Sequence, residues 1–293
     1  MNPRNLSLTA GGSSGGEAAL LALRGSILGV GTDVAGSLRI PAVCNNVYSF
    51  KPSSGRLPYN GQKLCGRSGS PGIVPSAGFF AHSARDLWLL SRNAILKEPW
   101  NRDAASYAVP WRDVKPKEQL VIGVISQDPA VPVTQPILDA IKKICEKLRE
   151  QDTYLVKEIS DFPSLVDSTA LAVEYFKTDE TNAAIENVKA SGEPLIPSIS
   201  TVVSPPRGFG RSLSRLFDMN VERAELKDRW RRLFVGIDVL LLPAAPHGAV
   251  PHDTWKSADY TVVWNLVDVR HFLSLLFSSN LPELGSVRTE GLY

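Results

Sequence analysis

The sequence predicts an α/β fold in which a mixed β-sheet core is flanked by helices. The main observation is a strand–helix–strand unit, in which an amphipathic helix at 134–149 lies between apolar runs at 120–125 and 154–156. A unit of this spacing predicts a parallel pair of strands. Apolar runs at 26–31 and 237–243 predict further strands beside helical segments, so strands and helices alternate over most of the chain.

Two glycine-rich turns near the start of the chain organise its first segments. They are Gly-Gly-Ser-Ser-Gly-Gly-Glu at 11–17 and Gly-Thr-Asp-Val-Ala-Gly-Ser-Leu-Arg-Ile-Pro at 31–41. Ser14 with Glu17 three positions later has the form of a capping box, which predicts a helix over 14–23. Because that helix is apolar almost throughout, we expect it to be buried, and we expect the same of the strand that follows it.

The remaining elements follow from caps, apolar periodicity and turn residues. Ser83, with Asp86 at the third helical position, is expected to begin a helix that carries an apolar stripe. Further helices are expected at 37–43, 164–190 and 220–234. Glycine, serine and proline predict loops at 32–36, 45–61, 61–78, 97–118, 191–212 and 244–259.

Composition restricts the class of protein. The 293 residues are 43% hydrophobic and carry a net charge of +2 without a long run of one sign, so a nucleic-acid partner is not expected. There is no signal-peptide pattern and no apolar run of membrane-spanning length. The three cysteines are too far apart for a metal-binding pair, and we expect Cys44 and Cys145 to pack as small apolar side chains. These features predict a single cytoplasmic domain with reduced thiols and without a metal, a cofactor or a membrane partner.

The chemistry of the two turns favours presentation of a nucleophile over phosphate binding. Gly16 is followed by Glu17 where a P-loop needs lysine, and no strand precedes the turn as a dinucleotide fingerprint requires. A sharp turn before a helix exposes a serine hydroxyl and directs backbone N–H groups to one point, where they can hold an oxyanion. Ser37 suits this position, and the 24 residues that separate it from Ser13 are enough for a helix out and a strand back, which would let the two hydroxyls meet. For Ser37 alone, a plain helix N-cap is the alternative.

A set of motifs spread over most of the chain follows one known pattern. After the two turns come Phe-Lys-Pro-Ser-Ser-Gly-Arg at 50–56 and Gly-Phe-Phe-Ala-His-Ser-Ala-Arg-Asp-Leu at 78–87. Ile-Gly-Val at 122–124, the apolar run at 238–243 and Trp-Asn-Leu-Val-Asp at 264–268 continue it. Together these motifs resemble the amidase signature family, and within it the acetamidase-like fungal amidases. The resemblance implies the amidase signature fold and hydrolysis of a carboxylic amide through a serine acyl-enzyme intermediate.

The resemblance also implies a role for each matched residue. Ser37 would be the acyl-ester nucleophile, and Ser13 would be the bridging serine, usually preceded by a cis peptide bond. Ser14 would support Ser13 by hydrogen bonding. Asp33 and Arg39 would be structural charges near the site, buried and in need of partners. The oxyanion hole and the substrate contacts would come from Val34, Ala35, Gly36 and Ser37, with Ser13 and Ser14 beside them.

Three departures from the family pattern qualify these roles. The family's lysine base lies well before the glycine–serine turn, whereas here no lysine precedes Lys51, which matches a different family position and receives no catalytic role. The tail at 269–293 diverges, so residues 1–293 are expected to form a partial amidase signature domain, truncated at its N-terminus. Ala35 stands where the family often has glycine, and it would strain the oxyanion loop if that position needed a positive φ.

Two functions therefore remain open. The first is an amidase that cleaves a small-molecule amide and is impaired because the lysine base is missing. The alternative is a catalytically inactive remnant that acts as a binding protein. A homodimer is left open as well. The substrate itself is not readable, because the loops around 61–78, 191–212 and 244–259 would shape the pocket.

Overall fold

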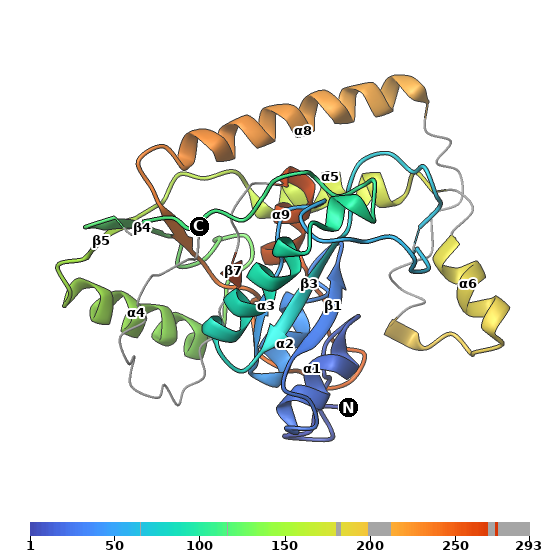
Figure 1. The fold of residues 1–293 in the computed structure, drawn as a ribbon, viewed down its shortest axis with the longest axis horizontal. Helices are drawn as coiled ribbons and strands as arrows, with labels where there is room; N and C mark the ends of the chain where they lie inside the picture. The colour runs from blue at the N-terminus through green and yellow to red at the C-terminus, as the bar shows by residue number, and fades with distance from the viewer. Residues whose placement is uncertain (65, 116, 180–182, 199–211, 269–272, 275–293) are drawn as a thin grey trace.

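The computed structural model describes residues 1–293 except 65, 116, 180–182, 199–211, 269–272 and 275–293. Within the described residues the strands form two sheets, around which the helices pack (Figure 1). One sheet has the order β1-β3-β2-β7 and is antiparallel, and the other has the order β5-β4-β6 and is parallel. The predicted α/β class and the mixture of strand directions are confirmed, with the two directions separated into two sheets.

The antiparallel sheet is built mainly from the N-terminal third of the chain. Its central strand β3 is buried along its whole length and pairs with β1 on one side and β2 on the other. The strands and the helices beside them are α1 (Gly15–Ala22), β1 (Gly29–Asp33), α2 (Arg39–Asn45), β2 (Tyr48–Phe50), β3 (Ser76–Ala81), α3 (Ala84–Leu96), the 3₁₀ helix η1 (Pro99–Asn101) and β7 (Leu273–Ser274).

The parallel sheet comes from the second part of the chain and confirms the predicted strand–helix–strand unit. β4 and β5 run parallel from the pair Leu120 and Tyr154, and α4 connects them with its apolar face on the sheet. The elements are β4 (Leu120–Val124), α4 (Gln135–Arg149), β5 (Tyr154–Glu158), α5 (Leu165–Phe176), α6 (Ala183–Ser191), α8 (Leu213–Leu233), β6 (Val239–Leu241) and α9 (Asp259–Val267).

The predicted helix caps differ in outcome. Ser83 caps α3 as predicted, because its Oγ accepts from the Asp86 backbone N–H at 3.1 Å. The capping box at Ser14 and Glu17 is wrong: Ser14 occupies the N-cap position of α1, but its side chain makes no cap hydrogen bond. The Ser14 hydroxyl instead bonds to the backbone of Thr32 in β1, so its oxygen accepts from the Thr32 N–H and not from an N–H of the first helical turn.

The burial predicted for the first helix and strand is also wrong in part. Only one side of α1 is buried, and Leu23 at its end is 64% exposed. β1 is an edge strand, so Val30 is 63% exposed and faces away from the core. An apolar run by itself does not distinguish a central strand from an edge strand, because that depends on which strands lie beside it.

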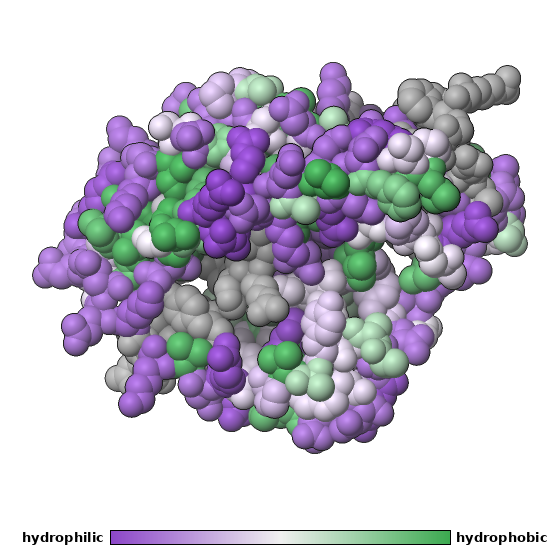
Figure 2. All heavy atoms as spheres, turned by 90° about the horizontal axis from the view of Figure 1, so that it is seen from above, coloured by the Kyte–Doolittle hydropathy of each residue, from purple (hydrophilic) through white to green (hydrophobic). Residues whose placement is uncertain are grey.

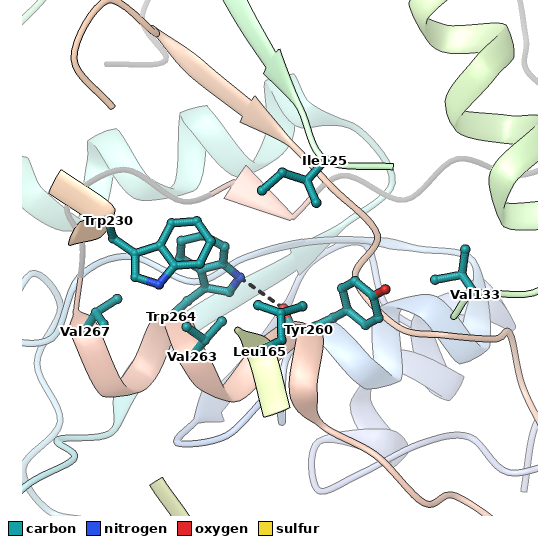
Figure 3. Packing of buried hydrophobic residues seen from close by; sticks show 8 residues of the cluster. All are labelled: Ile125, Val133, Leu165, Trp230, Tyr260, Val263, Trp264 and Val267. Atoms are coloured by element: carbon teal, nitrogen blue, oxygen red, sulfur yellow. Dashed lines mark hydrogen bonds between the residues drawn. The ribbon is translucent and has the colours of Figure 1, made fainter. Parts of the chain in front are cut away.

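The largest apolar core forms around α9, an element for which periodicity gave no prediction. Figure 3 shows how its side chains meet those of α5, α8 and the end of β4. The rings of Trp230 and Trp264 lie 4.7 Å apart between centroids, and Trp264 Nε1 donates to the Tyr260 carbonyl oxygen at 3.0 Å. The buried members of this cluster are Ile125, Val133, Leu165, Trp230, Tyr260, Val263, Trp264 and Val267.

The outer surface is mixed in character. The face over α8 is largely polar, with groups of apolar side chains between the charged ones (Figure 2). On α8 itself, Leu213, Phe217 and Val221 are exposed at intervals of about one helical turn. Among the described residues, no helix has both the length and the apolarity needed to cross a membrane.

A matched pair of isoleucine substitutions tests the assignment of the core. Ile125 is 1% exposed within the α9 cluster, whereas Ile27 is 81% exposed before β1. We expect Ile125→Ala to lower the free energy of unfolding by about 2–5 kcal/mol through lost burial and a cavity. Ile27→Ala should change it by less than about 0.5 kcal/mol. Urea denaturation followed by tryptophan fluorescence measures both, and equal shifts of the two midpoints would contradict the assignment.

Candidate active site

The structure joins the two glycine turns through a direct backbone contact. The Ser14 backbone N–H donates to the Ser37 carbonyl oxygen at 3.2 Å. The Ser14 hydroxyl spans to β1, where it accepts from the Thr32 N–H at 3.3 Å and lies 3.4 Å from the Thr32 carbonyl oxygen. The peptide bond between Gly12 and Ser13 is cis. The hydrogen bonds of Ser14 thus connect the first turn to β1 and to Ser37, while Ser13 is exposed and Ser37 is half-buried.

Ser37 lies on the short turn between the end of β1 and the start of α2. The N-cap position of α2 is occupied by Leu38, and no side chain caps the helix. The plain alternative for Ser37, a helix N-cap, is therefore excluded. Within this turn Gly36 has φ 134°, a backbone conformation that favours glycine.

The backbone amides of this turn are divided between two uses. The Gly36 N–H donates to Asp33 Oδ1 at 2.9 Å, so this amide already has an acceptor inside the protein. Within the described part of the chain, no acceptor is recorded for the N–H groups of Val34, Ala35 and Ser37. The four predicted oxyanion donors are thus reduced to three amides that are available to a ligand.

Asp33, at the end of β1, is fully buried and accepts hydrogen bonds on both carboxylate oxygens. The Leu38 N–H donates to Oδ2 at 3.1 Å, and Arg39 donates through Nε to Oδ2 at 3.0 Å and through Nη2 to Oδ1 at 2.8 Å. Burial by itself would raise the pKa of Asp33, but the charge and hydrogen bonds of Arg39 outweigh it and lower the pKa. The carboxylate therefore stays ionised beneath the turn.

Helix α9 completes the partners of this ion pair from the far end of the chain. Arg39 Nη1 donates to the Thr261 carbonyl oxygen at 2.7 Å, and Nη2 donates to Asn265 Oδ1 at 2.6 Å. Asn265 Nδ2 in turn donates to Asp33 Oδ1 at 2.9 Å. All four side chains are at most 2% exposed, so the charges are balanced in an interior from which water is excluded.

Ala35 does not carry the strain that a positive φ would have imposed. Ala35 is not among the residues with positive φ, and the left-handed conformation falls on Gly36 beside it. A Cβ atom on Gly36 would lie 2.3 Å from Thr261 Oγ1, so only glycine allows α9 to approach the turn this closely. Alanine at position 35 is therefore compatible with the observed loop.

Lys51 adds a second buried cation to this region. It is 2% exposed, follows β2, and donates through Nζ to the Pro52 carbonyl oxygen at 3.0 Å. The pKa of Lys51 is lowered to about 8: burial is the main cause, repulsion by Arg39 adds to it, and attraction by Asp33 and Asp268 offsets part of the change. Lys51 thus belongs to the charge cluster below the turn, and its ammonium group donates to the Pro52 carbonyl oxygen rather than to either serine.

Two residues that contact the turn received no role from the sequence, because they lie far from it along the chain. Thr261 and Asn265 contact Ala35 and Asp33 across more than 220 residues of chain. Asn265 and Asp268 lie in the family motif at 264–268, but the sequence of that motif does not indicate which residues they contact. Of the predicted pocket loops, part of 191–212 lies outside the described residues, and Ile73 of the 61–78 loop packs on the same apolar cluster as Ala35.

A surface hollow of about 610 Å³ lies elsewhere, between the 59–68 loop and α6. Neither Ser13 nor Ser37 lines it. Within the described residues, no group of three or more His, Cys, Asp and Glu side chains is arranged to hold a metal ion. Cys44 and Cys145 are buried free thiols, as predicted, whereas Cys65 lies outside the described residues.

The depressed pKa of Lys51 predicts a specific pH dependence of stability. Between about pH 8 and pH 10.5 the unfolded chain binds more protons at this lysine than the folded chain, so stability rises with pH across that window. The full difference corresponds to roughly 3 kcal/mol. We expect Lys51→Met to remove this rise, as measured by urea denaturation at a series of pH values.

The control for this measurement is Lys142→Met, which changes an exposed lysine of α4. It should leave the pH dependence of unfolding as in the parent chain. If Lys51→Met and Lys142→Met gave parallel curves between pH 8 and pH 10.5, the buried lysine would not be the group that titrates there.

Comparison with known proteins places this geometry in a family. The chain is 36% identical over 274 residues to an amidase of Gibberella moniliformis, covering 92% of this chain and 51% of that protein. It is 32% identical over 285 residues to an acetamidase of Aspergillus oryzae, covering 91% of this chain and 51% of the relative. The chain thus spans about half the length of these curated relatives.

Solved structures agree with the sequence matches. A fatty acid amide hydrolase superposes with a TM-score of 0.84 at 29% identity, covering 91% of this chain and 48% of the other. A crystal structure of an amidase superposes with a TM-score of 0.68 at 26% identity, covering 91% and 59% of the two chains. The family model described as Amidase matches residues 1–284, beyond Asp268 and into the segment predicted to diverge. The chain therefore belongs to the amidase family.

Proposed function

We propose that this chain carries the nucleophile and oxyanion parts of an amide-hydrolysing site, with Ser37 as the attacking residue and Ser13 as the relay. One observation supports this above the others: the half-buried Ser37 lies on a turn where the amides of Val34, Ala35 and Ser37 have no recorded acceptor within the described residues. Unpaired amides beside an accessible serine are the arrangement that stabilises a developing oxyanion.

The proposed reaction proceeds in two stages. Ser37 Oγ attacks the amide carbonyl carbon, and the carbonyl oxygen becomes an oxyanion that the free amides of the turn hold. Collapse of this intermediate breaks the carbon–nitrogen bond and releases the amine, which takes up the proton that the Ser37 hydroxyl lost, while the acyl group stays on Ser37. Water then attacks the acyl ester and releases the acid. The proton of the Ser37 hydroxyl leaves through Ser13.

The proposed activity is limited because no base is identified in residues 1–293 that would receive this proton. No lysine precedes Lys51 in the sequence, and the Lys51 ammonium is bonded to Pro52 within the buried charge cluster. In serine proteases, loss of a triad member leaves only about 10³–10⁴-fold acceleration over water, from the oxyanion hole and binding. We therefore propose that residues 1–293 by themselves are an impaired hydrolase.

The proposed substrate is a small-molecule amide with an apolar acyl part. Ala35 of the turn and Ile73 of the neighbouring loop pack on a cluster that includes Leu171 and Val262. This apolar packing beside Ala35 supports an apolar acyl part. The relatives named above are amidases and an acetamidase, and one structural relative is a fatty acid amide hydrolase, which supports an amide as the substrate class.

The second candidate function, a binding protein without turnover, shares the same site. The free amides of the turn favour it, because they can bind an amide or a carboxylate without a base. Two further parts of the proposal are independent of the chemistry.

We propose a cytoplasmic location, which reduced thiols favour. We also propose a homodimer. The edge strand β1, with the exposed apolar side chain of Val30, offers a surface for it.

Substitution of the proposed nucleophile tests the function. Purified residues 1–293 should hydrolyse acetamide or an aryl amide with kcat well below about 1 s⁻¹, the lower end of typical enzymes. Ser37→Ala should abolish even this rate, because the proposed acyl ester forms on the Ser37 hydroxyl. Product release is followed by chromatography, and Ser7→Ala, at an exposed serine near the same end of the chain, is the control.

Three results would contradict parts of this proposal. Turnover at ordinary enzymatic rates that Ser37→Ala abolishes would overturn the impairment. Turnover that persists in Ser37→Ala would overturn the assignment of the nucleophile. Saturable binding of an amide by calorimetry, without any product, would favour the binding protein over the hydrolase.

A further inference from the structure

The peptide unit between Ala35 and Gly36 is held at both of its polar ends. Its N–H group, on Gly36, donates to Asp33 Oδ1 at 2.9 Å. Its carbonyl group, on Ala35, accepts from Thr261 Oγ1 at 2.7 Å. A peptide plane that is bonded at both ends cannot rotate without breaking a buried hydrogen bond. The amides of Ala35 and Ser37 belong to the two neighbouring peptide planes, which join the held plane at the Cα atoms of Ala35 and Gly36, so holding this plane restricts how far both amides can move.

Thr261 is itself held in a single position. Its hydroxyl also lies 3.0 Å from the Ala258 carbonyl oxygen one turn earlier in α9, and its own carbonyl oxygen accepts from Arg39. The residue is 1% exposed. The absence of a side chain at Gly36 provides the room for this contact, since a Cβ atom there would lie 2.3 Å from Thr261 Oγ1.

Asn265, one turn further along α9, bonds to Asp33, which accepts from the N–H end of the Ala35–Gly36 peptide. Its Nδ2 donates to the Asp33 backbone oxygen at 3.2 Å and to Asp33 Oδ1 at 2.9 Å. Asp33 Oδ1 is the atom that accepts from the Gly36 N–H. One side chain of α9 therefore fixes the carbonyl end of the Ala35–Gly36 peptide, and another fixes the acceptor of its N–H end.

We propose that Thr261 and Asn265 are positioning residues for the oxyanion turn, which align the Ala35 and Ser37 amides from outside the turn. This inference rests on the proposed function of Ser37. Neither residue touches the substrate, and both act through Asp33, Ala35 and Gly36. The consequence is that α9, more than 220 residues away in sequence, determines how fast Ser37 reacts.

The experiment uses covalent labelling of Ser37, which needs the oxyanion donors but no leaving amine. An alkyl fluorophosphonate is the probe: the Ser37 Oγ–P bond forms, the P–F bond breaks, and fluoride and the hydroxyl proton leave to solvent. Thr261→Val removes the hydroxyl and keeps the shape of the side chain. We expect the maximal labelling rate to fall by about 10-fold to 100-fold, with the half-saturating probe concentration unchanged.

Two matched variants separate positioning from a structural role. Thr261→Ser keeps the hydroxyl and should label within about 3-fold of the parent chain, since the hydrogen bond to Ala35 remains. Thr169→Val makes the same chemical change in α5, which packs against α9, at a hydroxyl without a recorded hydrogen-bond partner among the described residues. It should label at the parent rate. Intact-mass spectrometry follows the labelling, and peptide mapping identifies Ser37 as the modified residue.

A second measurement does not depend on any chemistry at Ser37. Amide hydrogen exchange of the peptide that covers 33–39 should become faster in Thr261→Val and stay unchanged in Thr169→Val. If Thr261→Val fails to show a cooperative melting transition, the smaller Thr261→Ala takes its place in both measurements.

The outcomes separate the inference from the function on which it rests. Parent-like labelling and parent-like exchange in Thr261→Val would overturn the positioning role, as would a loss of labelling in Thr261→Ser alone. A parent chain that takes up no label at Ser37 would overturn the proposed function, while the exchange of 33–39 would still decide whether α9 holds the turn.

Discussion

The buried carboxylate of Asp33 is the constraint on which the site depends. It ends strand β1, accepts from the turn through the Gly36 and Leu38 amides, and pairs with Arg39 at the start of α2. An ionised group without water must have its hydrogen bonds supplied by the protein, and removal of one partner of such a pair costs about 3–5 kcal/mol. Because the partners of Asp33 come from the strand end, the turn and α9, satisfying this one charge fixes all three relative to each other.

Helix α9 connects this polar network to the apolar core. Thr261 and Asn265 on one side of the helix meet the turn, whereas Tyr260, Val263 and Trp264 on other sides pack against α5 and α8 (Figure 3). The same helix therefore carries both the aromatic side chains of the core and the hydroxyl that bonds to the Ala35 carbonyl oxygen. The packing of the core and the geometry of the turn are therefore not independent.

The local sequence was sufficient for the elements whose signals are short-range. The strand–helix–strand unit from β4 to β5 follows from apolar periodicity, and the cap of α3 follows from Ser83 and Asp86. The signal failed where a choice between competing partners was needed. The Ser14 hydroxyl could have capped α1 but bonds to Thr32, and the apolar run before Asp33 could have been central but lies at a sheet edge. In both cases the deciding partner is brought in by tertiary structure, and periodicity carries no information about it.

Residue types and spacing alone identified the groups that are available for chemistry: the serines of the two glycine turns, the pair Asp33 and Arg39, and a turn with glycine at position 36. How these groups are used depends on the tertiary structure. It directed the Gly36 amide inward to Asp33, left the amides of Val34, Ala35 and Ser37 without a recorded acceptor among the described residues, and placed Thr261 on the Ala35 carbonyl. The physical reason is that a hydrogen bond depends on position and direction in space. The contacts between α9 and the turn join residues more than 220 positions apart, where spacing along the chain says nothing about distance.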